Sequence, residues 1–119
     1  MIQDSFLLYI LLIHFLADFT LQTSEQAVRK SSENLFLFYH VGTYSITWLL
    51  ASWIFLPFPF AVIFASVTFV CHFITDYITS RMVKNFFEKK DYHNGFVVVG
   101  FDQLLHYVQL WLTFKFLLG

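Results

Sequence analysis

Long apolar stretches alternate with short links along this chain of 119 residues. Four stretches are predicted as helices, at about residues 6–21, 35–56, 60–79 and 96–118. They are 16 to 23 residues long, and crossing the hydrocarbon core of a bilayer takes about 20 helical residues. The pattern therefore predicts an all-α fold, a four-helix transmembrane bundle in which residues 1–119 form a single integral membrane domain.

The composition supports a surface that faces lipid. Hydrophobic residues make up 58% of the chain and charged residues 13%, whereas soluble domains carry about 25% charged residues. The net charge is −1, and the sequence contains neither a Gly-rich phosphate loop nor a basic nucleic-acid-binding module. We therefore expect membrane lipid as a partner and no nucleic acid.

The links predict how the bundle is oriented. Six of the seven Lys and Arg residues lie in the first and third links, 22–34 and 80–95, and only Lys115 lies elsewhere. Because basic loops stay in the cytoplasm, both links are expected on that side and both termini on the outer side. The second link, PFPF at 57–60, is predicted as a tight turn because proline does not continue a helix.

Histidine and aspartate recur at a spacing of four inside the apolar stretches. Residues four apart on a helix lie one turn apart on the same face. With five His and five Asp in the chain, chance predicts roughly 0.4 such pairs when they are counted against this template. Three occur: His14/Asp18, His72/Asp76 and Asp102/His106.

These pairs and one further histidine are predicted to converge. In the predicted orientation all seven residues lie at a similar depth, about 6–15 Å below the cytoplasmic boundary at 1.5 Å of rise per residue. Ionisable side chains at such a depth usually face the interior of a bundle, where they pair or do chemistry. We therefore predict a metal centre with the ligands His14, Asp18, His40, His72, Asp76, Asp102 and His106.

Imidazole and carboxylate ligands suit zinc, with manganese or iron as alternatives. Seven ligands exceed the four that one zinc ion takes and fit one or two ions bridged by a carboxylate. The single cysteine, Cys71, excludes a CxxC motif and is interpreted as core packing. Gln22 and Gln103 each lie near a predicted aspartate ligand and are expected to orient it.

Basic side chains near the predicted site indicate a phosphorylated substrate. Lys30 and Arg81 flank its cytoplasmic mouth, and His93 is either a loop residue or a further substrate contact. Divalent ions activate water and clamp phosphoryl groups. We therefore expect a metal-dependent hydrolase that acts on a phosphorylated, lipid-linked substrate, with activated water as the nucleophile.

Other interpretations stay open at this point. Buried Asp and His also occur in divalent-cation or proton transport modules, for which a homo-oligomer can provide the pathway. A structural membrane protein can use such residues as a hydrogen-bond network or a stabilising metal site. Haem is disfavoured because three of the histidines have an aspartate one turn away. An open ligand position favours the hydrolase, a polar track across the bundle favours transport, and a closed site favours a structural role.

The motifs also carry a resemblance that spans nearly the whole chain. HFLADFTLQ at 14–22, HFITDY at 72–77 and GFDQLLHY at 100–107 resemble a family of small bacterial and phage-associated integral membrane proteins of unknown function. This resemblance implies a multi-pass protein of the bacterial inner (cytoplasmic) membrane. More loosely, the HxxxD pairs are similar to those of membrane-bound metal-dependent hydrolases and of the helical zinc phospholipase C group, although this chain lacks the HxxxE of that group.

Overall fold

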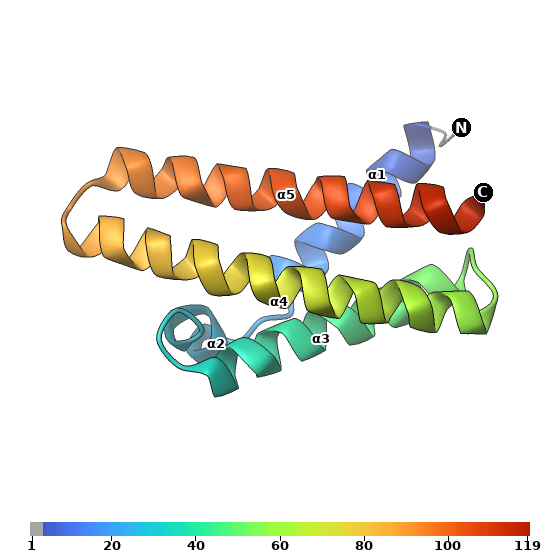
Figure 1. The fold of residues 1–119 in the computed structure, drawn as a ribbon, viewed down its shortest axis with the longest axis horizontal. Helices are drawn as coiled ribbons and strands as arrows, with labels where there is room; N and C mark the ends of the chain where they lie inside the picture. Colours follow the sequence, from blue (N-terminus) through green and yellow to red (C-terminus); the bar gives the residue numbers. More distant parts are fainter. Residues whose placement is uncertain (1–3) are drawn as a thin grey trace.

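The computed structural model describes residues 4–119, and this part of the chain is all-α, as predicted, with no strand. Helix α4 lies between α3 and α5, while α1 packs against α3 and α5 on another side (Figure 1). The helices in chain order are α1 (Asp4–Phe15), the π-helical turn η1 (Leu16–Thr20), α2 (Ser24–Arg29), α3 (Asn34–Trp53), α4 (Phe58–Glu88) and α5 (Tyr92–Leu118).

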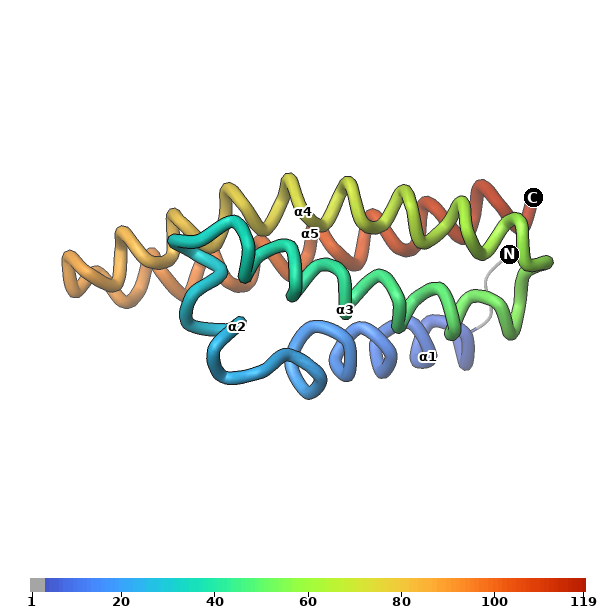
Figure 2. Tube along the Cα trace, turned by 90° about the horizontal axis from the view of Figure 1, so that it is seen from below, coloured from blue at the N-terminus to red at the C-terminus, as the bar shows by residue number. Residues whose placement is uncertain are grey.

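The long helices run up and down, which gives the bundle two distinct ends. Helix α1 begins and α5 ends at the same end, beside the turn between α3 and α4 (Figure 2). The other end holds α2 and the turn between α4 and α5. The two predicted basic links therefore lie together at one end of the bundle. We call this end the link end and the opposite one the terminal end.

Helix α4 is longer than the apolar stretch that predicted it. The predicted span ended at Thr79, and the predicted link covered 80–95. In the structure α4 continues to Glu88 and α5 begins at Tyr92. Hydropathy falls after Thr79, but the added turns contain good helix formers and no glycine or proline. The helix ends where Lys90 takes the left-handed conformation, at a φ of 60°.

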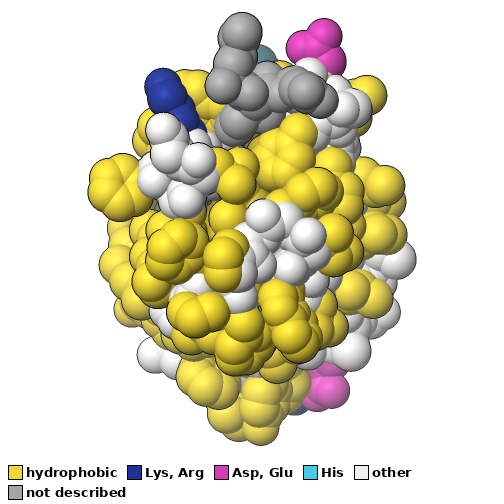
Figure 3. Space-filling model, turned by 90° about the vertical axis from the view of Figure 1, so that its right-hand side faces the viewer, with side chains coloured by type: hydrophobic (Ala, Val, Ile, Leu, Met, Phe, Trp, Pro, Cys, Tyr) yellow, Lys and Arg dark blue, Asp and Glu magenta, His cyan; other side chains and the backbone are white. Residues whose placement is uncertain are grey.

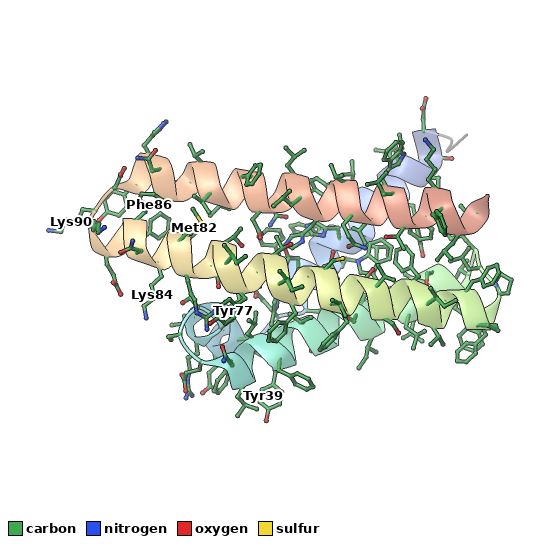
Figure 4. All side chains as sticks on the ribbon, in the orientation of Figure 1. Tyr39, Tyr77, Met82, Lys84, Phe86 and Lys90 are labelled. Carbon is green, nitrogen blue, oxygen red and sulfur yellow. The ribbon has the colours of Figure 1, made fainter. Side chains whose placement is uncertain are left out.

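The added turns give the molecule a protruding hairpin. Together with the start of α5 they project beyond α2 and the start of α3 (Figure 1), and they carry Met82, Lys84 and Phe86 (Figure 4). The two helices approach closely here, because a Cβ atom added to Gly95 of α5 would lie 2.2 Å from the ring of Phe87 on α4. A glycine at this position therefore allows the hairpin to close.

The first polar link is not a simple loop, because it contains α2. Thr23 caps this helix: its hydroxyl accepts from the backbone N–H of Gln26, and the Gln26 side chain accepts from the backbone N–H of Thr23. The guanidinium of Arg29 then pairs with Glu25 and Glu33, and its hydrogen bonds lower the pKa of the Glu33 carboxyl. These local interactions explain why so short a segment is helical.

The terminal end of the bundle has an apolar core. Trp48, Phe64 and Phe114 are fully buried, with ring centroids 5.5 Å apart for Trp48 and Phe64 and 4.2 Å apart for Phe64 and Phe114. Ile10 and Leu110 complete the same cluster. Side chains of α1, α3, α4 and α5 thus meet at the terminal end, and none of the described residues buries a charge there.

The outside of the molecule is also apolar. Large hydrophobic side chains are exposed on every long helix, and they cover most of the terminal end, with charged groups at its edges (Figure 3). By length and composition, one of the described helices, α4, is suited to cross a membrane. A surface of this kind is typical of a protein that contacts lipid or a large apolar partner.

Candidate metal centre

Six of the seven predicted ligands meet inside the bundle, between its apolar core and the link end. They come from η1, α3, α4 and α5, and all six are buried. We call them the His/Asp cluster. Within each of three overlapping groups, the candidate ligand atoms lie within 4.8 Å of one another: Asp18/His40/His72, His72/Asp76/His106 and Asp18/Asp102/His106.

A π-helical turn carries Asp18 into the cluster. The predicted span 6–21 is interrupted after Phe15, where the backbone N–H of Leu21 donates to the carbonyl oxygen of Leu16 at 2.8 Å, five residues back. A π-helical turn is wider than an α-helical one and occurs frequently at functional sites. The turn changes the direction in which Asp18 points relative to a regular helix, so it contributes directly to the geometry of the centre.

The Nε2 atoms of His40 and His72 lie at the separations expected around one ion, both from each other and from two carboxylate oxygens. His40 Nε2 is 3.2 Å from His72 Nε2 and 3.0 Å from Asp18 Oδ1. It is also 3.4 Å from Asp76 Oδ2. His72 Nε2 is 3.6 Å and 3.8 Å from the same two carboxylate oxygens. A tetrahedral ion with bonds of about 2.0–2.1 Å separates its ligand atoms by about 3.3 Å, so these residues fit a divalent metal.

The two carboxylate oxygens of this set are not satisfied by hydrogen bonds. Within residues 4–119, no hydrogen bond reaches Asp18 Oδ1 or Asp76 Oδ2, although nitrogen atoms lie within 3.0–3.4 Å of each. The nitrogens are close but not aligned to donate. Leaving a buried polar atom without a partner costs about 1–3 kcal/mol. A metal ion would satisfy both oxygens, because its bonds do not require an aligned N–H group.

The charges of the cluster fit one divalent cation. Asp18, Asp76 and Asp102 contribute three carboxylates, and the only cation beside them among the described residues is Lys30, whose Nζ lies 3.2 Å from Asp76 Oδ2. Three negative charges and one positive charge leave a net charge of −2. Buried charge is costly unless it is balanced, so one divalent ion would complete the site.

Aromatic stacking orients the histidines. The Tyr44 ring stacks on His72 with centroids 3.9 Å apart, and His72 stacks on His106 at 4.1 Å. His106 Nε2 lies 3.1 Å from Asp102 Oδ1, which accepts a hydrogen bond of 2.6 Å from the Thr79 hydroxyl. Asp102 and His106 therefore form a second set of candidate ligands beside the first, and Asp18 belongs to groups on both sides.

The seventh predicted ligand, His14, is buried next to the cluster, but both of its ring nitrogens form hydrogen bonds to residues outside the cluster. Its Nδ1 lies 2.8 Å from the Tyr44 hydroxyl, and its Nε2 lies 2.6 Å from Gln103 Oε1. It is absent from the groups able to hold an ion among the described residues. Gln103 lies beside the aspartates, and its Nε2 donates to Asp18 at 3.2 Å and to Asp102 at 3.1 Å.

A cavity of about 570 Å³ opens beside the cluster toward the link end. One part of its lining is polar and includes all three aspartates, Gln22 and Gln103. Another part is apolar, with Phe19 from η1 and Val83, Phe87 and Val99 from the protruding hairpin. Lys30 and Lys84 also line it. The cavity therefore combines carboxylates, two ammonium groups and an apolar wall, a lining suited to an amphiphilic ligand.

Two of the three predicted phosphate contacts lie away from this cavity. Arg81 donates to Asn34 Oδ1 at 2.7 Å and to the Tyr77 backbone carbonyl at 3.1 Å, and its guanidinium covers the Tyr77 ring. His93 is exposed in the first turn of α5. Neither lines the cavity. Because α4 continues as a helix, Arg81 reaches Asn34 at the start of α3, whereas Lys84 lines the cavity.

Comparison with known proteins identifies the family. Residues 6–118 match the family described as "Protein of unknown function (DUF3307)". The chain belongs to this family. The match confirms the predicted resemblance to an uncharacterised family, and it covers every helix that contributes to the His/Asp cluster. No curated protein and no solved structure matches the chain.

In this DUF3307 protein, three residues of the site were not predicted as such. The Tyr44 hydroxyl holds His14 beside the cluster, the Thr79 hydroxyl holds Asp102 within it, and Lys84 takes the place beside the cavity that Arg81 was expected to occupy. Tyr44 lies one turn beyond His40, and Thr79 lies three residues beyond Asp76. Helical spacing from the predicted ligands was therefore the available signal for both hydroxyls.

Proposed function

We propose that this protein is a membrane-embedded, metal-dependent hydrolase that cleaves a phosphate ester of a lipid-linked substrate. One observation carries the proposal. The buried His/Asp cluster, with ligand atoms that lack hydrogen bonds, adjoins a cavity of about 570 Å³ that is lined partly by lysines and partly by apolar side chains. A site with an accessible side favours a reaction over a purely structural role.

In this proposal a divalent ion, zinc first and manganese or iron as alternatives, binds His40, His72, Asp18 and Asp76. Asp102 and His106 offer a second position. When bound, the ion supplies Lewis-acid chemistry, activating water and stabilising charge on phosphoryl oxygens. The protein contributes the orientation of the ligands, a low-dielectric surrounding and cations that bind the substrate phosphate.

The cavity lining supports a phosphorylated amphiphile as the substrate. Lys30 and Lys84 supply ammonium groups for a phosphate, a role that lysine commonly takes as a point charge. The apolar wall formed by Phe19, Val83 and Phe87 suits the first part of a hydrocarbon chain. A free sugar phosphate would leave this wall exposed to water, so the lining favours a lipid-linked molecule.

We further propose that the four long segments cross the bacterial inner membrane, with the link end in the cytoplasm. The exposed apolar side chains on each long helix support this placement. The molecule is 45 Å long, and a hydrocarbon core is about 30 Å thick, so the protruding hairpin would reach the cytoplasmic headgroups. A membrane-impermeant thiol reagent applied from the periplasm should miss cysteines introduced at Glu25 or Lys89. Labelling at either position would show that the link end faces the periplasm.

Transport is less well supported. Beyond the cluster, the terminal end is filled by the buried side chains of Trp48, Phe64 and Phe114. A polar track across the bundle would have to pass this core, which contains no buried charge. The apolar core therefore favours a site that is reached from one side.

The proposal is tested by metal analysis followed by an activity assay. Protein purified without added metal or a histidine tag should contain about one equivalent of a divalent metal, and in liposomes it should hydrolyse a phospholipid or an isoprenoid phosphate. Asp76→Asn should lose both properties.

A matched pair on α4 tests the substrate contact. Lys84→Gln should raise KM, whereas Arg81→Gln, the same kind of change about one turn away at a side chain that bonds to Asn34 and does not line the cavity, should leave it unchanged. Metal-loaded wild type that cleaves none of these substrates and instead carries divalent ions across liposomes would replace the proposal with transport.

A further inference from the structure

Tyr44, His14 and Gln103 form a continuous hydrogen-bond chain that ends on two carboxylates of the His/Asp cluster. We infer that these three are positioning residues: this hydrogen-bond chain holds Asp18 so that it presents one oxygen to the proposed ion, holds Asp102 so that it presents one oxygen to the second position, and leaves His14 outside the ligand set. This inference rests on the proposed metal site, and it assigns a role to Tyr44 that the sequence did not indicate.

The orientation of the Gln103 amide is fixed by its surroundings. Its Nε2 lies 3.2 Å from Asp18 Oδ2 and 3.1 Å from Asp102 Oδ2. Ionised carboxylates only accept hydrogen bonds, so the group between them must be the donating NH2. The amide oxygen of Gln103 therefore faces His14.

The state of His14 follows from this orientation. Its Nε2 lies 2.6 Å from the Gln103 oxygen, which only accepts, so Nε2 carries the proton. Its Nδ1 is 2.8 Å from the Tyr44 hydroxyl and accepts the proton of that hydroxyl. The ring is fully buried. Neither nitrogen has a lone pair free for an ion, although the i, i+4 spacing to Asp18 suggested a ligand.

The hydrogen-bond chain distinguishes the oxygens of the two carboxylates: one oxygen of each bonds to Gln103, and the other faces a histidine. Gln103 holds Oδ2 of Asp18 and Oδ2 of Asp102. The remaining oxygens face histidines: Asp18 Oδ1 lies 3.0 Å from His40 Nε2, and Asp102 Oδ1, which also accepts from the Thr79 hydroxyl, lies 3.1 Å from His106 Nε2. One amide therefore sets the direction of two candidate ligands that come from different helices, η1 and α5.

Tyr44 links this chain to the opposite side of the cluster. Its hydroxyl donates to His14, while its ring stacks on His72 at 3.9 Å. A single buried side chain of α3 thus positions the carboxylates through one group and a histidine ligand through another. Partners that orient metal ligands typically change metal affinity by about 10–100-fold when they are removed, so we expect an effect of this size.

The test uses metal affinity, measured by competition with a chelator, and needs no substrate. Tyr44→Phe removes only the hydroxyl and should weaken binding by about 10-fold or more. Tyr107→Phe is the matched control, because the Tyr107 ring contacts His14 at 4.8 Å between centroids without a hydrogen bond to it. It should leave affinity unchanged. Equal affinity of the two variants would overturn the role of Tyr44.

The same substitution at two histidines tests whether His14 is a ligand. His14→Gln keeps a group able to donate to Gln103 and to accept from Tyr44, so it should retain the bound ion with affinity close to wild type. It should also keep the visible absorption spectrum of the cobalt-loaded protein, which reports the ligand set. His14→Leu should weaken binding while keeping that spectrum. His72→Gln should lose the ion or change the spectrum, and the same loss in His14→Gln would make His14 a ligand.

The outcomes separate this inference from the proposed function. If the wild type binds the ion and the variants change metal affinity as predicted, but no substrate is hydrolysed, the hydrolase proposal is overturned and the role of the hydrogen-bond chain is supported. If the wild type hydrolyses lipid phosphates, and Tyr44→Phe and His14→Leu bind the ion as tightly as wild type, the hydrolase proposal is supported and the positioning role of the hydrogen-bond chain is overturned. Wild type that takes up no divalent ion overturns both.

Discussion

The two halves of the bundle use the same helices in opposite ways. At the terminal end α1, α3, α4 and α5 bury aromatic rings and aliphatic side chains against one another, as with Trp48, Phe64 and Phe114. Toward the link end the same helices bury three aspartates and four histidines. In the first half apolar contacts predominate, although the indole Nε1 of Trp48 has no hydrogen-bond partner among the described residues, whereas in the second several candidate ligand atoms, among them Asp18 Oδ1 and Asp76 Oδ2, have none.

This difference separates stability from function. Apolar packing contributes to the free energy of unfolding without requiring a ligand. Buried polar atoms without partners oppose folding, and where several of them are clustered ligand atoms, as with Asp18 Oδ1 and Asp76 Oδ2, a bound ion would satisfy them. We expect substitutions at the terminal end to change stability and substitutions in the cluster to change metal binding, and four predictions test this division.

The largest effect is expected from His72→Ala. His72 belongs to two of the three candidate ligand groups and lies within 3.2–3.8 Å of three others in the proposed site. Its loss should lower metal affinity by more than about 100-fold, since a direct ligand contributes more than its supporting partners. The protein should still fold, because the apolar core is intact. Metal analysis and circular dichroism check the two halves of this expectation.

Phe64→Ala should have the converse effect. Phe64 is fully buried against Trp48 and Phe114, and Phe→Ala changes in cores lower the free energy of unfolding by about 3–5 kcal/mol. Metal content per folded molecule should stay at the wild-type level. Unfolding in mixed micelles measures the first quantity. A folded Phe64→Ala protein without metal would show that the two halves are not independent.

Gly95→Ala should cause a smaller loss of stability in the protruding hairpin. The new Cβ would lie 2.2 Å from the Phe87 ring, and overpacking of this kind costs about 1–3 kcal/mol. Gly100→Ala, on the same helix with no atom within 4 Å of the added Cβ, is the matched control and should be neutral or slightly stabilising. Thermal unfolding distinguishes them. Equal unfolding temperatures would mean that α4 and α5 separate easily at this end.

The smallest effect is a pH dependence of α2. Hydrogen bonds from Arg29 lower the pKa of Glu33 below its ordinary value, so the ionised carboxylate is favoured in the folded protein. The stabilisation by this pair is therefore present above the ordinary pKa and is lost as the pH falls through the lowered pKa. The protection of the α2 amides, measured as the exchange rate relative to the intrinsic rate at the same pH, should fall over this acidic range, and Glu33→Gln should remove this change in protection while leaving protection in α5 unchanged.

Much of the fold could be predicted from local sequence patterns. The four apolar stretches correspond to α1 with η1, α3, α4 and α5, because hydropathy and helix length are local properties of the chain. The boundary of α4 could not be predicted in the same way. Polar residues after Thr79 indicated a loop, but polarity and helix propensity are different properties, and here the helix continues through polar residues to Glu88.

The candidate ligands were also visible in the sequence, since i, i+4 spacing stacks His72 with Asp76 and Asp102 with His106 on single helix faces. The partners of each side chain were not. His14 has the same spacing to Asp18 as the other pairs have, yet its nitrogens bond to Tyr44 and Gln103, which lie 30 and 89 residues away. Spacing within one helix cannot indicate such contacts.

The sequence alone determined that the chain is helical, where its apolar segments lie and which residues are able to bind a metal. Only the tertiary structure decided which of these residues face one another, that Lys84 rather than Arg81 lines a cavity, and that the cavity has one polar and one apolar side. The physical reason is that helix formation depends on neighbours within about one turn. A site depends on side-chain directions set by packing between helices that are far apart in the chain.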